Sequence, residues 1–198
     1  MKIIGVISDT HIPSRAPSLP APVIEAFREV DLIIHAGDLV SKRTIKDLEG
    51  LAPLLAVAGN HDVKRFSHEL PTGKIIALKN YLIGVTHGGK SPSDYPIAAE
   101  NAQKFFKDKL LNIIIFGHTH QPLIQYDGRT LLLNPGSPTD NRHGWPNSFA
   151  RLKIDDAITV ELSFFSKIKG AYQIDKNVVT ISAPARLPPR IGRHEKKG

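Results

Sequence analysis

The sequence predicts an α/β fold in which two sheets stack face to face and helices cover the outside. In the first half of the chain, short apolar runs of strand length alternate with segments of helical periodicity, which is typical of parallel strands joined by helical crossovers. In the second half, strand-like runs follow one another across short turns, with one helical segment among them. The length of 198 residues suits one domain with a sizeable core.

The first half is expected to form three buried strands, over residues 3–7, 32–34 and 54–57, because each is an apolar run. Right-handed crossovers between them would make these strands parallel. The polar residues that follow each strand would then meet at one carboxyl edge of the sheet, where open α/β sheets place their sites.

Two helices are expected between these strands. The first follows a proline-rich loop, since apolar residues recur at helical spacing from Val23 to Val30 and Pro22 suits a first helical turn. The second spans residues 41–50, with Ser41 as its cap and Gly50 ending it.

The second half is expected to contain further strands, over residues 74–78, 81–86, 113–116, 123–126, 130–133, 149–154 and 158–163, and near 178–181. Asp127-Gly128 predicts a hairpin turn. Asp94 is expected to cap a helix that runs to about Lys109. Its inner face is expected to hold Ile97, Asn101, Ala102 and Phe105.

The composition is that of an ordinary soluble globular protein, with 41% apolar and 23% charged residues. No apolar run approaches the length of a membrane span, and Met1-Lys2 leads straight into the first strand, so we expect no membrane association, no signal peptide and a cytoplasmic location. Cysteine is absent, which excludes disulfides, thiolate catalysis and Cys-ligated zinc.

The net charge of +7 is unevenly spread. Residues 186–198 hold five basic side chains and one acidic, a net charge of +4. We therefore expect one domain over residues 1–183 and a basic, flexible tail over residues 184–198. Nucleic-acid binding through this tail is the less favoured interpretation, and the sequence leaves the oligomeric state open.

Five polar clusters follow strand-like runs: Asp9-Thr10-His11, Gly37-Asp38, Gly59-Asn60-His61-Asp62, Thr86-His87-Gly88 and Gly117-His118-Thr119-His120. Together they offer seven donors, enough for two metal ions that share Asp38: Asp9, His11, Asp38, Asn60, His87, His118 and His120. This mixed nitrogen and oxygen set suits manganese, iron, zinc, nickel or cobalt better than calcium or magnesium.

Each cluster alone also has a plainer interpretation. Asp9 can cap the following loop, and Asn60 suits a turn. A lone histidine such as His87 is more often structural than a ligand. The pair His118-x-His120 is the most informative, since a structural need for two imidazoles on one loop is hard to name.

The remaining histidines have weaker signals. His35 lies within a strand end and is expected to orient a neighbour or fill the core. Three others have no partner that the sequence identifies: His68, His143 and His194.

The ordered series of clusters resembles the calcineurin-like metallophosphoesterases over roughly residues 1–165. The further motif Asn134-Pro135-Gly136-Ser137 resembles their small single-domain phosphodiesterase branch, which also includes the retromer scaffold subunit. The resemblance implies a four-layer α/β/β/α sandwich of two packed mixed sheets with flanking helices. It implies that Asp9, His11, Asp38 and His120 bind one metal ion, and that Asp38, Asn60, His87 and His118 bind the other. One departure from the family pattern is Thr86, which stands where many relatives have glycine; this position is not one of the implied metal ligands.

The function expected from this resemblance is a metal-dependent phosphoesterase, foremost a phosphodiesterase that hydrolyses small phosphodiesters by attack of a hydroxide bridging two divalent ions. Manganese is the first expectation, with nickel, iron, cobalt and zinc as alternatives. Asp38 and His61 are the candidate catalytic residues, and His61 would bind phosphate or protonate the leaving group. Candidate substrate-binding residues are Asn60, His61, Arg142 and His143, the last two at the entrance.

Two other functions stay open. A non-catalytic, protein-binding scaffold on the same fold predicts little bound metal and no turnover, and it would have no reason to keep the complete ligand set together with His61. A nuclease gains support from the basic tail, although 198 residues leave little apparatus for gripping a duplex. The motifs do not separate a diester from a monoester substrate.

Overall fold

The computed structural model describes residues 1–62 and 69–181, and its first half follows the predicted alternation. The elements are β1 (Lys2–Ile7), α1 (Ala21–Phe27), β2 (Leu32–His35), α2 (Lys42–Glu49) and β3 (Leu54–Ala56). β2 pairs with β1 on one side and with β3 on the other, and both pairings are parallel, as the helical crossovers predict.

The second half continues with strands and short helices. In order they are β4 (Gly73–Leu78), β5 (Tyr81–Thr86), the 3₁₀ helix η1 (Pro92–Ile97), α4 (Ala98–Phe105), β6 (Ile113–Ile115), β7 (Leu123–Tyr126), β8 (Leu131–Asn134), the 3₁₀ helix η2 (Arg142–Gly144), β9 (Asn147–Ile154), β10 (Ile158–Ile168) and β11 (Ala171–Ile181). Each strand expected from the sequence has a counterpart here.

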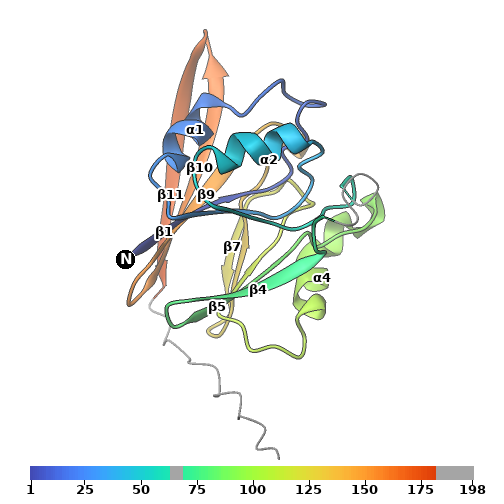
Figure 1. The fold of residues 1–198 in the computed structure, drawn as a ribbon, viewed down its shortest axis with the longest axis vertical. Coiled ribbons are helices and arrows are strands. Elements are labelled where there is room, and N and C mark those ends of the chain that lie inside the picture. The colour runs from blue at the N-terminus through green and yellow to red at the C-terminus, as the bar shows by residue number, and fades with distance from the viewer. Residues whose placement is uncertain (63–68, 182–198) are drawn as a thin grey trace, which may run out of the picture.

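The described strands form two mixed sheets packed face to face (Figure 1). The six-stranded sheet has the order β11-β10-β9-β1-β2-β3, and the five-stranded sheet has the order β4-β5-β6-β8-β7. β5, β6 and β8 are parallel, so each sheet contains a block of three parallel strands. The predicted sandwich architecture is confirmed.

Three apolar clusters hold the layers together. The largest lies between the sheets and joins Ile4 and Ile34 of one sheet to Ile83 and Ile113 of the other. A second packs α1 and α2 on the six-stranded sheet, and a third packs α4 on the five-stranded sheet. Because successive strand residues point to opposite faces, each sheet supplies apolar side chains both to the middle and to its own helical layer.

The predicted α2 boundaries are confirmed in detail. The Ser41 hydroxyl accepts a hydrogen bond from the Thr44 N–H at 3.2 Å, and Gly50 ends the helix. Leu48 is fully buried against the six-stranded sheet.

The helix predicted from Asp94 to about Lys109 is wrong in its limits and in its inner face. It begins as η1, where Ser91 and Asp94 form a capping box, and α4 ends at Phe105. A 3₁₀ helix turns about 120° per residue rather than 100°, so the face assigned from α periodicity is displaced. Of the four residues expected inside, Ala102 is buried, Ile97 and Phe105 are exposed, and Asn101 is partly buried.

The hairpin of β10 and β11 is longer than predicted. Its register runs from Ile158 opposite Ile181 to Ile168 opposite Ala171, with Lys169 and Gly170 at positive φ in the turn. This two-stranded ribbon rises past α1 in Figure 1. Tyr172 and Ile174 alternate with Gln173 and Asp175 in its outer part, so this signal was present in the sequence and was missed, although both apolar side chains are exposed.

Within the described residues, no helix is both long enough and apolar enough to cross a bilayer. The predicted tail over residues 184–198, with His194, lies outside the described residues, as does His68.

Candidate metal centre

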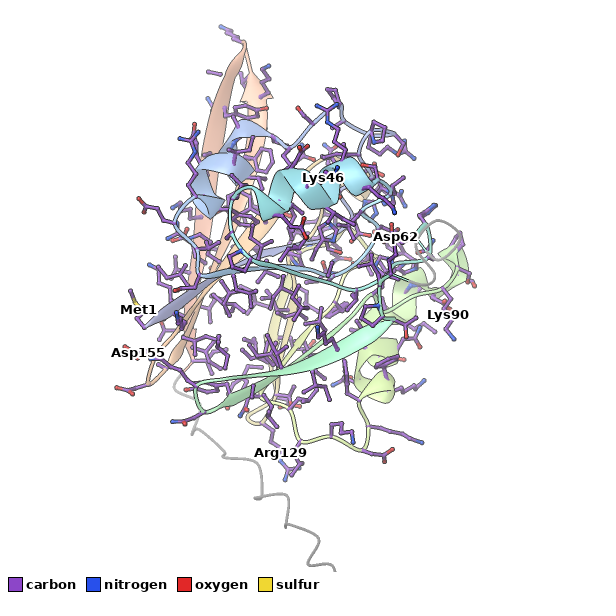
Figure 2. The ribbon with its side chains drawn as sticks, in the orientation of Figure 1. Met1, Lys46, Asp62, Lys90, Arg129 and Asp155 are labelled. Atoms are coloured by element: carbon purple, nitrogen blue, oxygen red, sulfur yellow. The ribbon has the colours of Figure 1, made fainter. Side chains whose placement is uncertain are left out.

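The loops that follow β1, β2 and β3 of one sheet, and β5 and β6 of the other, meet at one edge of the sandwich. Asp62 and Lys90 mark this end in Figure 2, opposite Met1 and Asp155. All seven predicted donors come together there. Six of them are buried and Asn60 is partly exposed; the buried six are Asp9, His11, Asp38, His87, His118 and His120.

Backbone contacts hold the first two loops against each other. The Asp9 N–H donates to the Gly37 carbonyl at 2.9 Å, and the His11 N–H donates to the Asp38 carbonyl at 3.0 Å. Non-glycine residues at positive φ cost about 1–3 kcal/mol each and gather at functional sites. Five of the donors have this conformation: Asp9, His11, Asp38, His118 and His120.

One group of donor atoms lies around Asp9. His11 Nε2 and His120 Nε2 are 3.3 Å apart, and His120 Nε2 is 3.5 Å from Asp9 Oδ1. The donor atoms of these three residues all lie within 4.8 Å of one another. Asp38 completes the group, with its Oδ2 at 3.5 Å from His11 Nε2.

A second group adjoins the first through Asp38. The same Asp38 Oδ2 is 3.5 Å from His87 Nε2. Asn60 Oδ1 lies 3.0 Å from His87 Nε2 and 3.1 Å from His118 Nδ1. Asp38 thus stands between two sets of nitrogen and oxygen donors, as a carboxylate shared by two ions would.

Backbone carbonyls fix the orientation of three imidazoles. His87 Nδ1 lies 2.8 Å from the Ala36 carbonyl, His118 Nε2 lies 3.0 Å from the Ser91 carbonyl, and His120 Nδ1 lies 2.8 Å from the Asp140 carbonyl. A carbonyl only accepts, so in each ring this nitrogen carries the proton. The other ring nitrogen then faces the centre, which is how metal-binding histidines are usually held.

The donor arrangement fits metal ions rather than a self-satisfied polar core. Asp9 Oδ1 is buried and has no hydrogen-bond partner among the described residues. Its other oxygen accepts from the Ser8 hydroxyl at 2.6 Å and from the His118 N–H at 2.9 Å. An orphaned carboxylate oxygen is costly unless something positive faces it, and it faces the inward nitrogens of His87 and His120 at 3.9 and 3.5 Å.

Two glycines make this convergence possible. A Cβ atom on Gly59 would overlap the Asp38 carboxylate, and one on Gly117 would overlap the Ser8 hydroxyl and crowd Asp9 Oδ2. The glycines therefore let neighbouring loops approach closely enough for their donors to meet.

The titratable groups of the centre have pKa values that are shifted in different directions by burial and by neighbouring charges. Burial lowers the pKa of His11 to about 4, against the opposing charges of Asp9 and Asp38. Burial also acts to lower the pKa of His87, but the hydrogen bond to Asp38 and the charges of both aspartates outweigh it and raise the pKa to about 9. Burial alone would raise the pKa of Asp38, yet His87 and His11 hold it well below its usual range.

The sequence of this chain matches the model of the calcineurin-like phosphoesterase superfamily domain over residues 1–157. The chain belongs to the calcineurin-like phosphoesterase superfamily.

Its relatives place this phosphoesterase domain in the small single-domain branch. It is 42% identical over 154 residues to a probable metallophosphoesterase of Methanothermobacter thermautotrophicus, covering 77% of this chain and 86% of the relative. It is 31% identical over 147 residues to a phosphodiesterase of Methanocaldococcus jannaschii, covering 67% and 82%. In fold it is similar to the crystal structure of Vps29 from Chaetomium thermophilum, with a TM-score of 0.78, 21% identity and coverage of 93% and 100%.

His61 of this phosphoesterase domain lies at the surface of the centre. Its N–H donates to Asp38 Oδ1 at 2.8 Å, and its ring packs edge-on against His11 with centroids 5.1 Å apart. Its Nε2 is 4.0 Å from Asp38 Oδ2, and its side chain is 55% exposed. The ring is therefore close enough to form part of a donor group with His11 and Asp38, and free enough to meet a substrate.

A cavity of about 440 Å³ opens over the centre, and we call it the front cavity. Its lining includes Asn60, His61, Tyr95 and Arg142. Arg142, one of the candidate substrate-binding residues, thus lines the cavity over the centre. The side chain of His143 lies outside what the structure describes.

Asp140 and the residues before it support the centre, a role that the sequence did not predict. The Ser137 hydroxyl donates to the Asp9 carbonyl at 2.8 Å, and the Thr139 hydroxyl donates to the Thr10 carbonyl at 2.6 Å. The Asp140 carboxylate accepts from Arg142 Nη2 at 2.8 Å while its carbonyl orients His120. The signal available was the Asn-Pro-Gly-Ser motif, which ends in one of these supports, Ser137, and had been interpreted only as the mark of a branch.

Asp62 has a role that its place in the third cluster did not reveal. Its carboxylate accepts hydrogen bonds from the N–H groups of Leu39 at 3.1 Å, Val40 at 2.7 Å and Gly59 at 3.0 Å. Asp62 thereby ties the Asp38 loop to the Asn60 loop.

His35 orients neighbours, as expected. Its Nδ1 accepts from the Gly37 N–H at 3.2 Å, so the proton must sit on Nε2, which lies 3.1 Å from the Thr10 hydroxyl. Full burial lowers the pKa of His35 to about 3, which keeps this ring neutral.

Proposed function

We propose that this chain is a phosphodiesterase that uses two divalent metal ions bound by the seven converging donors. The observation that carries the proposal is the set of inward-facing ring nitrogens of His87, His118 and His120 around the orphaned Asp9 Oδ1. In the proposed arrangement one ion is held by Asp9, His11, Asp38 and His120. The other is held by Asp38, Asn60, His87 and His118. Manganese is the first candidate, because the set mixes imidazole with carboxylate and amide oxygens.

Two such ions would supply Lewis acidity toward a phosphoryl oxygen and a water that ionises near neutral pH. The residues of the chain would hold these ions in fixed positions. Asp38 is held by the His61 N–H, and Asp62 fixes the loop around it. This rigidity keeps the shared carboxylate in place during turnover.

His61 is the proposed general acid for the leaving oxygen, or a donor to the phosphate. Its exposed ring borders the front cavity, directly beside the donors. Arg142 lines the same cavity with a guanidinium held by Asp140, so it would meet the anionic substrate in a fixed orientation.

The test is hydrolysis of an aryl phosphodiester and an aryl phosphomonoester with added manganese, before and after chelation. The proposal expects metal-dependent turnover that chelation abolishes and manganese restores. Absence of turnover on both esters, or turnover that survives complete removal of metal, would overturn it.

The likeness in fold to Vps29 keeps a protein-binding scaffold as the second candidate function. A scaffold has no need for histidine nitrogens oriented around an orphaned carboxylate oxygen. Little bound metal together with no turnover would favour the scaffold, and salt-sensitive binding of nucleic acid would favour the nuclease.

A further inference from the structure

A second cavity, of about 760 Å³, adjoins the candidate metal centre. Among the described residues, Asn60 is the one that borders both this cavity and the front cavity. His87, Gly88 and Gly89 line its side toward the centre. We call it the lysine cavity, after Lys90 and Lys104, which line it together with Asn101 and Phe105.

The 3₁₀ helix η1 and the residue before it form the wall between the two cavities. Pro92, Tyr95 and other η1 residues line the front cavity, whereas Asp94 lines the lysine cavity. The wall is anchored to the centre, because the Ser91 carbonyl lies 3.0 Å from His118 Nε2. The Asp94 carboxylate secures its start by accepting from the Ser91 N–H at 3.1 Å.

The lysine cavity combines positive charge with a flat apolar surface. Neither Lys90 nor Lys104 forms an ion pair with any residue that the structure describes. Asp94 is the one acidic residue in the described lining, and its Oδ2 also accepts from the Lys90 N–H at 2.7 Å, so the two lysines leave positive charge in excess. The Phe105 ring is 52% exposed and lies over Gly73, where a side chain would displace it.

We propose that the lysine cavity is the subsite for the retained ester arm of a phosphodiester, and that this arm is flat and carries a negative charge. The inference rests on the proposed function and names its substrate class. A diester places two organic arms on one phosphorus, whereas a monoester has one. Two cavities that meet at Asn60, itself 3.0 Å from His87 Nε2, provide for both arms.

The position of His61 decides which arm enters which cavity. His61 borders the front cavity, so the leaving oxygen that it would protonate belongs to the arm in that cavity. The arm that stays on phosphorus then extends past Asn60 toward Phe105, with its charged end near Lys90 and Lys104.

The experiment compares two diesters with the same leaving group, p-nitrophenyl phenyl phosphate and p-nitrophenyl 4-carboxyphenyl phosphate, in the presence of manganese. They differ only in the carboxylate group on the retained arm, which adds one negative charge. The wild-type chain should prefer the carboxylated arm by roughly fivefold in kcat/KM, mainly through KM, and added salt should shrink the preference. p-Nitrophenyl phosphate, a monoester without a retained arm, is the internal reference.

Lys104→Glu and Lys90→Glu should each abolish or invert this preference, measured as the ratio of kcat/KM for the two diesters. Lys107→Glu is the matched control, since Lys107 is exposed nearby on the chain but does not line the cavity. Phe105→Ala should raise KM for both diesters by a larger factor than it raises KM for the monoester. An unaltered preference in both lysine variants, or an equal effect of Lys107→Glu, overturns the subsite. Loss of manganese-dependent hydrolysis of all three esters by the wild-type chain instead overturns the proposed function.

Discussion

The imidazoles of the centre differ in protonation because they differ in their surroundings. Burial dominates at His11 and lowers its pKa to about 4. At His87 the hydrogen bond to Asp38 and the charges of two carboxylates prevail, and its pKa rises to about 9. At neutral pH, His11 is therefore ready to bind a cation, whereas His87 must first release a proton.

Metal affinity should consequently rise with pH. Between pH 6 and 8, displacement of one proton from His87 predicts roughly a tenfold gain in affinity per pH unit. Calorimetry in two buffers of different ionisation enthalpy would count the released protons. The raised pKa also stabilises the metal-free fold fully below about pH 6.5, and this contribution is lost as pH rises through about 9. A metal affinity that does not change across this range would contradict the assignment.

Substitutions of Asp38 and His61 should have different effects on metal content and turnover. Asp38→Asn removes the shared carboxylate charge, so both metal ions and activity should be lost, as measured by metal analysis and turnover. His61→Ala should retain its metal but turn over slowly, by roughly 10²–10⁴-fold, because a general acid has been removed. Wild-type turnover in His61→Ala would show that the role assigned to His61 is wrong.

At the scale of elements, the strand ends were predictable and the supports of the ligands were not. Buried strands are apolar runs, so the polar residues that follow β1, β2 and β6 stand out in the sequence. The carbonyls that orient His118 and His120 come from Ser91 and Asp140, and a backbone carbonyl has no sequence signature. The α4 face was misjudged for a related reason, since the 3₁₀ turn before it changes the period.

The cap of α2 can be tested alone. Ser41→Ala removes the acceptor for the Thr44 N–H and should destabilise the fold by about 1 kcal/mol. Chemical denaturation would measure the change in free energy of unfolding. Ser166→Ala, at an exposed position of β10, is the control and should change it by less than about 0.5 kcal/mol. Equal effects of the two substitutions would show that the Ser41 cap does not stabilise the fold.

At the scale of the whole molecule, the donors come from both sheets. Asp9, Asp38 and Asn60 follow strands of the six-stranded sheet, whereas His87 and His118 follow strands of the other. A bound ion would therefore bridge the two sheets directly, in addition to the apolar core between them.

Metal removal should lower the melting temperature of the wild-type chain. An ion present at 100 times its Kd stabilises by about 2.7 kcal/mol, which is a shift of roughly 5–10 °C for a domain of this size. Thermal denaturation with manganese and with chelator measures it. Asp38→Asn should show no such shift, and a wild-type melting temperature indifferent to both additions would refute the bridging ions.

The spread of donors along the chain also sets when metal can be acquired. The amino-terminal stretch holds Asp9, His11, Asp38 and Asn60, but His118 and His120 lie more than half-way along the sequence. During synthesis, neither donor group is complete until the loop after β6 has emerged and the second sheet has docked on the first. Metal would then bind late in synthesis and folding. The fraction of purified protein that contains metal would therefore report the fraction that has reached the native state.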